Sequence, residues 1–178
     1  MPAILPNILI TGTPGTGKTS TTQLAAEKSG FKCINVGDIV KQHECHEGKD
    51  GEFDSYILDE DKLCDVLEPI MLEGGCIVDF HSPEFFPERW FELVLVLRTN
   101  TEVLFDRLQE RGYSEKKRTE NMECEIMEIV SEAAKESYAV EIVHELQSNT
   151  IEELESNVDR VVSWIDAWKA NNITSEDP

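Results

Sequence analysis

A glycine-rich segment near the start of the chain carries the residue types that hold nucleotide phosphates. Gly12 to Thr19 have the sequence GTPGTGKT, which matches G-x-x-x-x-G-K-[ST] at every position. Glycines let backbone N–H groups approach phosphate oxygens, and the start of a following helix adds positive charge. Lys18 is expected to reach the outer phosphates, and the Thr19 hydroxyl to face Mg²⁺. The segment therefore predicts a site for a nucleoside triphosphate with magnesium, whose contacts here are Gly15, Thr16, Gly17, Lys18, Thr19 and Ser20.

An acidic residue at the end of an apolar segment is the expected partner of this loop. Asp79 follows the apolar residues Cys76 to Val78, so its carboxylate is expected beside the loop, as in a Walker B motif. Simple turn chemistry is the alternative for such an aspartate. We predict that Thr19 and Asp79 hold Mg²⁺, partly through water. His81 is either a structural histidine or a group that orients water or relays a proton.

Basic residues later in the chain are candidates for closing the site. Arg107 and Arg111 are one helical turn apart, so both can point at one anion, and the basic residues Lys116 to Arg118 follow. Phosphoryl transfer uses mobile cations that close over the triphosphate and exclude water, which favours a lid over a merely solvated surface. The predicted catalytic residues are Lys18, Asp79, His81, Arg107 and Arg111, and Arg111 is also expected to contact ATP.

Five apolar segments and the helical segments between them would position these side chains. Strands are predicted at 7–11, 32–36, 76–80, 93–97 and 142–146. Helices are predicted at 18–29, from about 38, from 59 to the glycines at 74 and 75, from 99–101 to 111, from 119 past 133, and at 151–170, with a loose polar segment at 48–55 and a basic loop before 119. This alternation predicts an α/β doubly wound P-loop domain, a parallel five-stranded sheet flanked by helices, with ligands at the carboxyl ends of the strands.

Composition limits the possible partners and compartments. The chain has 178 residues, which suits one domain at 1–170 with a disordered tail at 171–178. Its formal charge of −20 repels a polyanion such as RNA. No apolar stretch approaches the roughly 20 residues of a membrane span. Five cysteines without a C-x-x-C pair suit a reducing compartment. We expect an intracellular protein that binds neither nucleic acid directly nor a membrane.

Several motifs together resemble one family of nucleotide kinases. They are the loop at 12–19, Asn35 to Asp38, Val78 to His81, Phe85 to Trp90 and the tract from Arg107 to Lys117. Over residues 6–168 the sequence resembles the nuclear adenylate kinase isoenzyme family, also called coilin-interacting nuclear ATPase. The resemblance implies a broad-specificity nucleoside monophosphate kinase, converting ATP and AMP into two ADP, with ATPase activity. It also implies a role in small ribosomal subunit maturation, a basic ribosomal protein of that subunit as partner, and a location in nucleus and cytoplasm.

The same resemblance assigns the second substrate and the lid. It implies a monophosphate-binding segment at 35–58, a lid at 110–120, and monophosphate contacts from Gly37, Asp38, Lys41 and Arg89. Two positions depart from the family pattern. Lys41 stands where arginine is frequent and cannot bind a phosphate bidentately, and Thr150 stands where a basic side chain near the adenine is expected.

Three other functions share parts of this pattern. The first is a regulatory ATPase in ribosome assembly whose kinase activity is incidental. The second is a GTP-binding switch, which is disfavoured because the chain lacks an N/T-K-x-D motif. The third is a small-molecule kinase acting on shikimate or gluconate, which shares the loop and the size. The products formed from ATP with a panel of acceptors distinguish them.

Overall fold

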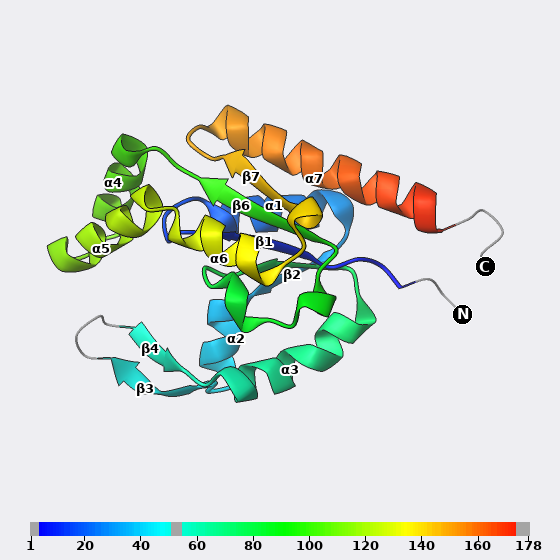
Figure 1. Ribbon diagram of the computed structural model, residues 1–178, viewed down its shortest axis with the longest axis horizontal. Helices are drawn as coiled ribbons and strands as arrows, with labels where there is room; N and C mark the ends of the chain where they lie inside the picture. Colours follow the sequence, from blue (N-terminus) through cyan, green and yellow to red (C-terminus); the bar gives the residue numbers. More distant parts are fainter. Residues whose placement is uncertain (1–3, 51–54, 174–178) are drawn as a thin grey trace.

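Five strands form the parallel sheet that the sequence predicts. The computed structural model describes residues 4–50 and 55–173, and its main sheet has the order β2 (Lys32–Asn35), β5 (Cys76–Asp79), β1 (Ile8–Gly12), β6 (Leu93–Arg98) and β7 (Val143–Gln147) (Figure 1). Each neighbouring pair is parallel, and every boundary lies within one residue of its predicted position. The doubly wound α/β fold is confirmed, because helices separate these strands in sequence and cover both faces of the sheet.

Seven α-helices lie within the described residues. They are α1 (Lys18–Ser29), α2 (Val36–Gln42), α3 (Glu60–Glu73), α4 (Thr101–Glu110), α5 (Glu115–Ile126), α6 (Ile129–Ser137) and α7 (Ile151–Asn172), with 3₁₀ turns η1 (Pro83–Phe85), η2 (Glu88–Trp90) and η3 (Val140–Ile142). Asp59 caps α3 by accepting a hydrogen bond from the Lys62 N–H, as its acidic start predicts. No helix in these ranges combines the length and apolar character needed to cross a bilayer.

The three inner strands of the sheet, β5, β1 and β6, are buried on both faces, which explains their continuous apolar sequences. Ile8 and Ile10 of β1 belong to one core cluster with Val161 of α7, whereas Leu9 between them belongs to another with Leu67 of α3. Packing on both faces holds the inner strands in place, and the carboxyl ends of the strands point toward α4 and α5 (Figure 1).

Two predictions for residues 36–58 are wrong. Helix α2 begins at Val36 instead of near Asp38, because the Asn35 side chain accepts a hydrogen bond from the Asp38 N–H and caps the helix earlier. The two ends of the segment expected to be loose, 48–55, belong to an antiparallel pair, β3 (His46–Asp50) and β4 (Ser55–Leu58), which projects beside α2 and α3 in Figure 1, and 51–54 lie outside the described residues. The polar sequence of β3 hides this pairing, because it lacks the apolar alternation typical of a half-buried strand.

The basic loop and the helix after it also differ from prediction. The residues Lys116 to Arg118 lie within α5, which begins four positions before the predicted Thr119 because Ser114 accepts a hydrogen bond from the Lys117 N–H. The predicted single helix breaks at Glu128, whose φ of 57° is left-handed, and continues as α6. At the other end, α7 reaches Asn172, so 171 and 172 are helical, and the rest of the predicted tail from 174 lies outside the described residues.

Candidate nucleotide-binding site

A cavity of about 580 Å³ lies at the carboxyl ends of the strands. Its walls come from the phosphate loop, from the segment between β2 and α2, from the end of β5 and the turn after it, and from α5 and α6. The lining includes Pro14, Lys18, Thr19, Asn35, Gly37, Asp79, His81, Glu84, Arg111, Tyr113, Lys117, Glu120 and Cys124. Residues predicted from four separate sequence motifs therefore meet in one cavity.

The phosphate loop rests directly on the apolar side of α4. Gly15 has a φ of 97°, and a Cβ atom there would lie 2.8 Å from Leu104 and 2.9 Å from Leu108. Both leucines are fully buried. Glycine is therefore required at this position by backbone conformation and by close packing. The loop ends at Gly17, another left-handed residue, from which α1 begins.

Lys18 is the cation that the loop itself carries. Its Nζ donates a hydrogen bond to the Thr13 carbonyl at 3.2 Å. Burial lowers the pKa of Lys18 to about 8, and the charge of Arg111 adds to this, while the charges of Asp79 and Glu125 oppose it. With this pKa most Lys18 side chains still carry their proton at pH 7, and the ammonium faces a cavity with few other basic residues in its lining.

Asp79 and Thr19 make direct contact, as the magnesium prediction requires. The Thr19 hydroxyl donates to Asp79 Oδ2 at 2.8 Å, and the Asn35 amide donates to the same oxygen at 2.9 Å. Asp79 is buried, so these two donors compensate a carboxylate that has little access to water. A hydroxyl and a carboxylate side by side are hard oxygen ligands of the kind that Mg²⁺ prefers. The residues present therefore fit this ion.

His81 lies on the cavity wall, two residues beyond Asp79. Its side chain is exposed to the cavity, and its ring centroid is 4.5 Å from that of Phe80. The surrounding protein and the charge of Lys18 lower the pKa of His81 below its usual value. The imidazole is therefore neutral at physiological pH and a weaker base than an ordinary histidine, with one ring nitrogen able to accept a hydrogen bond.

The two arginines of α4 face different environments. Arg107 Nη1 donates to the carbonyl oxygens of Gly15 at 3.2 Å and Ser148 at 2.9 Å, so this side chain ties the phosphate loop to the end of β7. Arg111, at the end of the helix, is exposed and lines the main cavity. Arg107 therefore supports the loop and lines the depression beside it, its catalytic role stays a prediction, and Arg111 faces the main cavity.

A second depression of about 370 Å³ adjoins the loop on the side of α7. Gly15, Gly17 and Ser20 of the predicted ATP contacts line it, with Arg111 shared between the two cavities. Thr150, which departs from the family pattern, also lines this depression. Thr16 is buried within the loop, and its backbone carbonyl accepts a hydrogen bond from the Ser148 hydroxyl at 2.6 Å.

The predicted monophosphate contacts are only partly brought together. Gly37 lines the main cavity, whereas Asp38 and Lys41 are exposed on α2 outside its lining. Arg89 lies in a different depression and forms an ion pair with Glu68, with 2.8 Å between Arg89 Nη2 and Glu68 Oε1. This arrangement does not bring Arg89 to the cavity.

Several contacts at the site have no recognisable sequence signal. Ser148 follows the last strand and therefore lies at the predicted edge, which was the only available clue. Asn35 is a helix cap whose amide also reaches Asp79. Glu125 lies on α5 and accepts a hydrogen bond from the Thr13 hydroxyl at 2.8 Å, a contact across 112 positions that no local pattern indicates.

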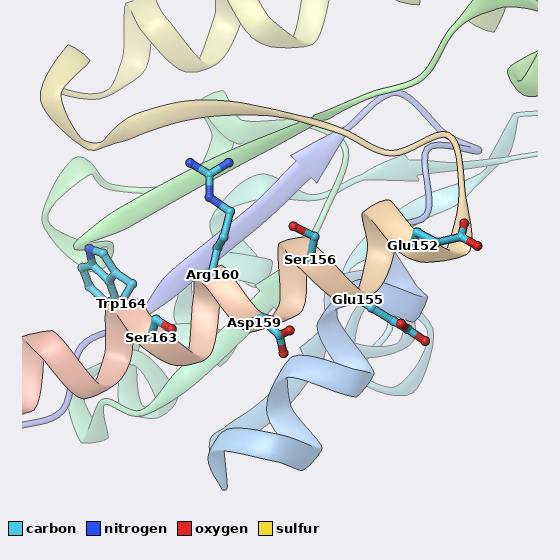
Figure 2. A pocket seen from close by; sticks show the side chains of 7 residues that line it. All are labelled: Glu152, Glu155, Ser156, Asp159, Arg160, Ser163 and Trp164. Atoms are coloured by element: carbon cyan, nitrogen blue, oxygen red, sulfur yellow. The ribbon is translucent and has the colours of Figure 1, made fainter.

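A surface depression along α7 lacks the features of a site. Figure 2 shows its lining side chains, Glu152, Glu155, Ser156, Asp159, Arg160, Ser163 and Trp164, all carried by this one helix. Arg160 and Asp159 point away from each other, so charges do not converge on a common point. This depression is the surface of a single helix, whereas several elements enclose the cavity at the strand ends.

Comparisons with known proteins agree with this geometry. A family model described as "AAA domain" matches residues 8–128. The chain is 50% identical to "Adenylate kinase isoenzyme 6 homolog" of Dictyostelium discoideum over 167 residues, covering 94% of this chain and 95% of that one. It is 49% identical to the protein of the same name from Schizosaccharomyces pombe, covering 94% and 96%. A shikimate kinase from Acinetobacter baumannii in complex with shikimate matches with a TM-score of 0.65 at 16% identity, covering 93% and 96%, which concerns the fold alone.

Proposed function

The chain belongs to the family of adenylate kinase isoenzyme 6 homologues, and from that premise we propose that it is a broad-specificity nucleoside monophosphate kinase with ATPase activity. Family and fold already make it a nucleotide kinase with a P-loop. The observation that carries the finer proposal is the meeting of Lys18, Thr19 and Asp79 in one cavity that also contains the exposed guanidinium of Arg111.

The proposed reaction moves one phosphoryl group. An oxygen of the AMP phosphate bonds to the terminal phosphorus of ATP, the bond from that phosphorus to the β-phosphate oxygen breaks, and two ADP result. Lys18 stabilises negative charge on the transferring group, and Arg111 meets it from the end of α4. We propose that residues 110–120 act as the lid and residues 35–58 as the monophosphate segment, supported by Gly37, Arg111 and Tyr113 in the cavity wall.

Mg²⁺ is the proposed cofactor, held by Thr19 and Asp79. The 2.8 Å contact between their oxygens supports this choice, since both are hard ligands within the same cavity. When bound with ATP, the ion neutralises phosphate charge. Asn35 orients Asp79 through its amide and keeps the carboxylate directed at Thr19.

Hydrolysis of ATP without a monophosphate is the alternative activity, and His81 is the observation that favours it. A neutral imidazole in the cavity that Asp79 also lines can accept a hydrogen bond from water and orient its oxygen toward the terminal phosphorus. Under this alternative the protein is a regulatory ATPase, and phosphorylation of AMP is incidental.

Product analysis with an acceptor panel tests the proposal. The wild type is incubated with ATP and Mg²⁺ and with AMP, other nucleoside monophosphates, shikimate or gluconate, and all products are separated. We expect two ADP per AMP consumed, with Lys18→Ala as the inactive control. Phosphate release without loss of AMP supports the ATPase instead. Phosphorylation of shikimate or gluconate, with AMP untouched, refutes both.

The cellular role is proposed from the family resemblance. We propose participation in small ribosomal subunit maturation, binding of a basic ribosomal protein, and presence in nucleus and cytoplasm. The formal charge of −20 supports a basic partner through electrostatic attraction. Affinity purification of the tagged chain, with fluorescence imaging of the same cells, tests both points. Absence of small-subunit proteins from the purified material contradicts the proposed partner.

A further inference from the structure

A buried carboxylate on α5 contacts the phosphate loop. Glu125 is 5% exposed. Its Oε1 accepts a hydrogen bond from the Thr13 hydroxyl at 2.8 Å, and its Oε2 accepts from Arg98 Nε and the Thr99 N–H, both at 2.9 Å. Such a charge is stable in the interior only because each oxygen has a donor. In the contact with Thr13 the hydroxyl therefore donates and the carboxylate accepts.

Thr13 connects this carboxylate to the lysine of the site. While its hydroxyl binds Glu125, its carbonyl oxygen accepts hydrogen bonds from Lys18 Nζ at 3.2 Å, from the Thr16 hydroxyl at 2.8 Å and from the Thr16 N–H at 3.2 Å. Thr13 is fully buried, so water does not replace these partners. A shift of Thr13 would move the carbonyl that holds the Lys18 ammonium.

Arg98 fixes the other side of Glu125. Its guanidinium also pairs with Glu128 at 3.0 Å and Glu145 at 3.2 Å, so β6, the α5–α6 junction and β7 meet at one cation. Burial alone would lower the pKa of Arg98, but the hydrogen bonds that its guanidinium donates to these carboxylates raise it. Glu125 is thus held by the rigid end of a central strand, while the earlier residues of its helix line the nucleotide cavity.

We propose that Glu125 is a positioning residue, which fixes Thr13 and through it the Lys18 ammonium, and so couples α5 to the phosphate loop. The inference rests on the proposed phosphoryl transfer for its effect on rate. The positioning of Thr13 by Glu125 depends only on the hydrogen bonds described above.

Three single variants test it. Glu125→Gln removes the charge and one acceptor, Thr13→Val removes the hydroxyl with little change of shape, and Glu128→Gln is the control that weakens the Arg98 cluster from its exposed side. We expect at least a tenfold fall in kcat for the first two, with KM for ATP within threefold of wild type, and kcat within twofold for Glu128→Gln. The double variant Thr13→Val, Glu125→Gln should be no more than twofold slower than the slower single variant, because both act through one hydrogen bond.

A second measurement is independent of activity. Hydrogen exchange at the Thr16 N–H, followed by NMR, should be at least tenfold faster in Glu125→Gln and Thr13→Val than in Glu128→Gln. If Glu125→Gln does not fold, Thr13→Val gives the same answer. Equal kcat and equal Thr16 exchange in Thr13→Val and Glu128→Gln would overturn the proposal. A wild type without phosphoryl transfer would refute the proposed function, and the exchange rates would still decide the positioning role.

Discussion

Burial weakens the hold of Lys18 on its proton, and this makes nucleotide binding pH-dependent. With a pKa of about 8 in the ligand-free site, Lys18 loses its charge as the pH rises from 7 to 9. Phosphate binding favours the charged form, so at higher pH the site must first take up a proton. We expect the Kd for MgATP, measured by calorimetry, to rise about tenfold between pH 7 and pH 9. Lys18→Ala should bind weakly with no such rise, and a constant wild-type Kd would contradict the assignment.

His81 is the residue expected to separate hydrolysis from transfer. If the neutral imidazole orients the attacking water through a hydrogen bond, His81→Gly lowers phosphate release at least fivefold more than it lowers ADP formation from AMP, equivalent to about 1 kcal/mol of differential barrier. Nucleotide binding should remain nearly intact. Both rates and the melting temperature are measured on one preparation. A parallel fall of both activities with lower Tm would identify a structural histidine.

Helix α4 presents two arginines for different purposes, and paired substitutions distinguish them. Arg107→Ala removes a donor from the carbonyls of Gly15 and Ser148, the second of which keeps the Thr99 hydroxyl, and should destabilise the protein by about 1 to 3 kcal/mol, lowering Tm by several degrees. Arg111→Ala removes an exposed side chain and should leave Tm within about 1 °C, since surface substitutions cost little.

For kcat we expect the larger effect from Arg111→Ala, whereas for Tm the larger effect comes from Arg107→Ala. Arg111→Ala should lower kcat more than tenfold, about 1.4 kcal/mol, if its charge meets the transferring phosphoryl group. A change confined to KM for ATP would make Arg111 a ground-state contact. If Arg107 acts only as a support, Arg107→Ala should change activity only as far as the loop is displaced, whereas a wild-type Tm with a large loss of kcat would support its predicted catalytic role.

The elements that could be predicted are those whose residue types depend directly on burial or on the ligand that they bind. The strands from Cys76 and Leu93 are apolar throughout because both faces are covered, and the phosphate loop requires its own residue types. The β3–β4 pair and the start of α5 were missed because polar residues at 46–50 and 115–118 carry no burial pattern. Contacts such as Thr13 to Glu125 depend on packing between distant elements, so only the folded chain reveals them.

The net charge of the whole molecule predicts that the protein does not bind nucleic acid directly. With 36 acidic and 16 basic residues, the average field repels nucleic acid, and its few basic side chains at the site face a cavity of small-molecule size. We expect the anisotropy of a labelled single-stranded RNA to stay unchanged up to about 100 µM protein at roughly 150 mM salt. A labelled basic peptide of equal length serves as the control, and its binding should weaken as salt is added. Saturable RNA binding in this range would contradict the expectation.

The close packing of Gly15 over α4 makes two parts of the gene interdependent. A side chain at Gly15 would collide with Leu104 and Leu108, which themselves fill the core beneath the loop. Neither surface is free to change alone, so a library that randomises the loop while leaving both leucines constant would return mostly glycine at this position. Smaller residues at 104 and 108 would remove the collision but not the left-handed backbone at Gly15, so directed evolution that reshapes this loop has to change its backbone course together with the helix that packs against it.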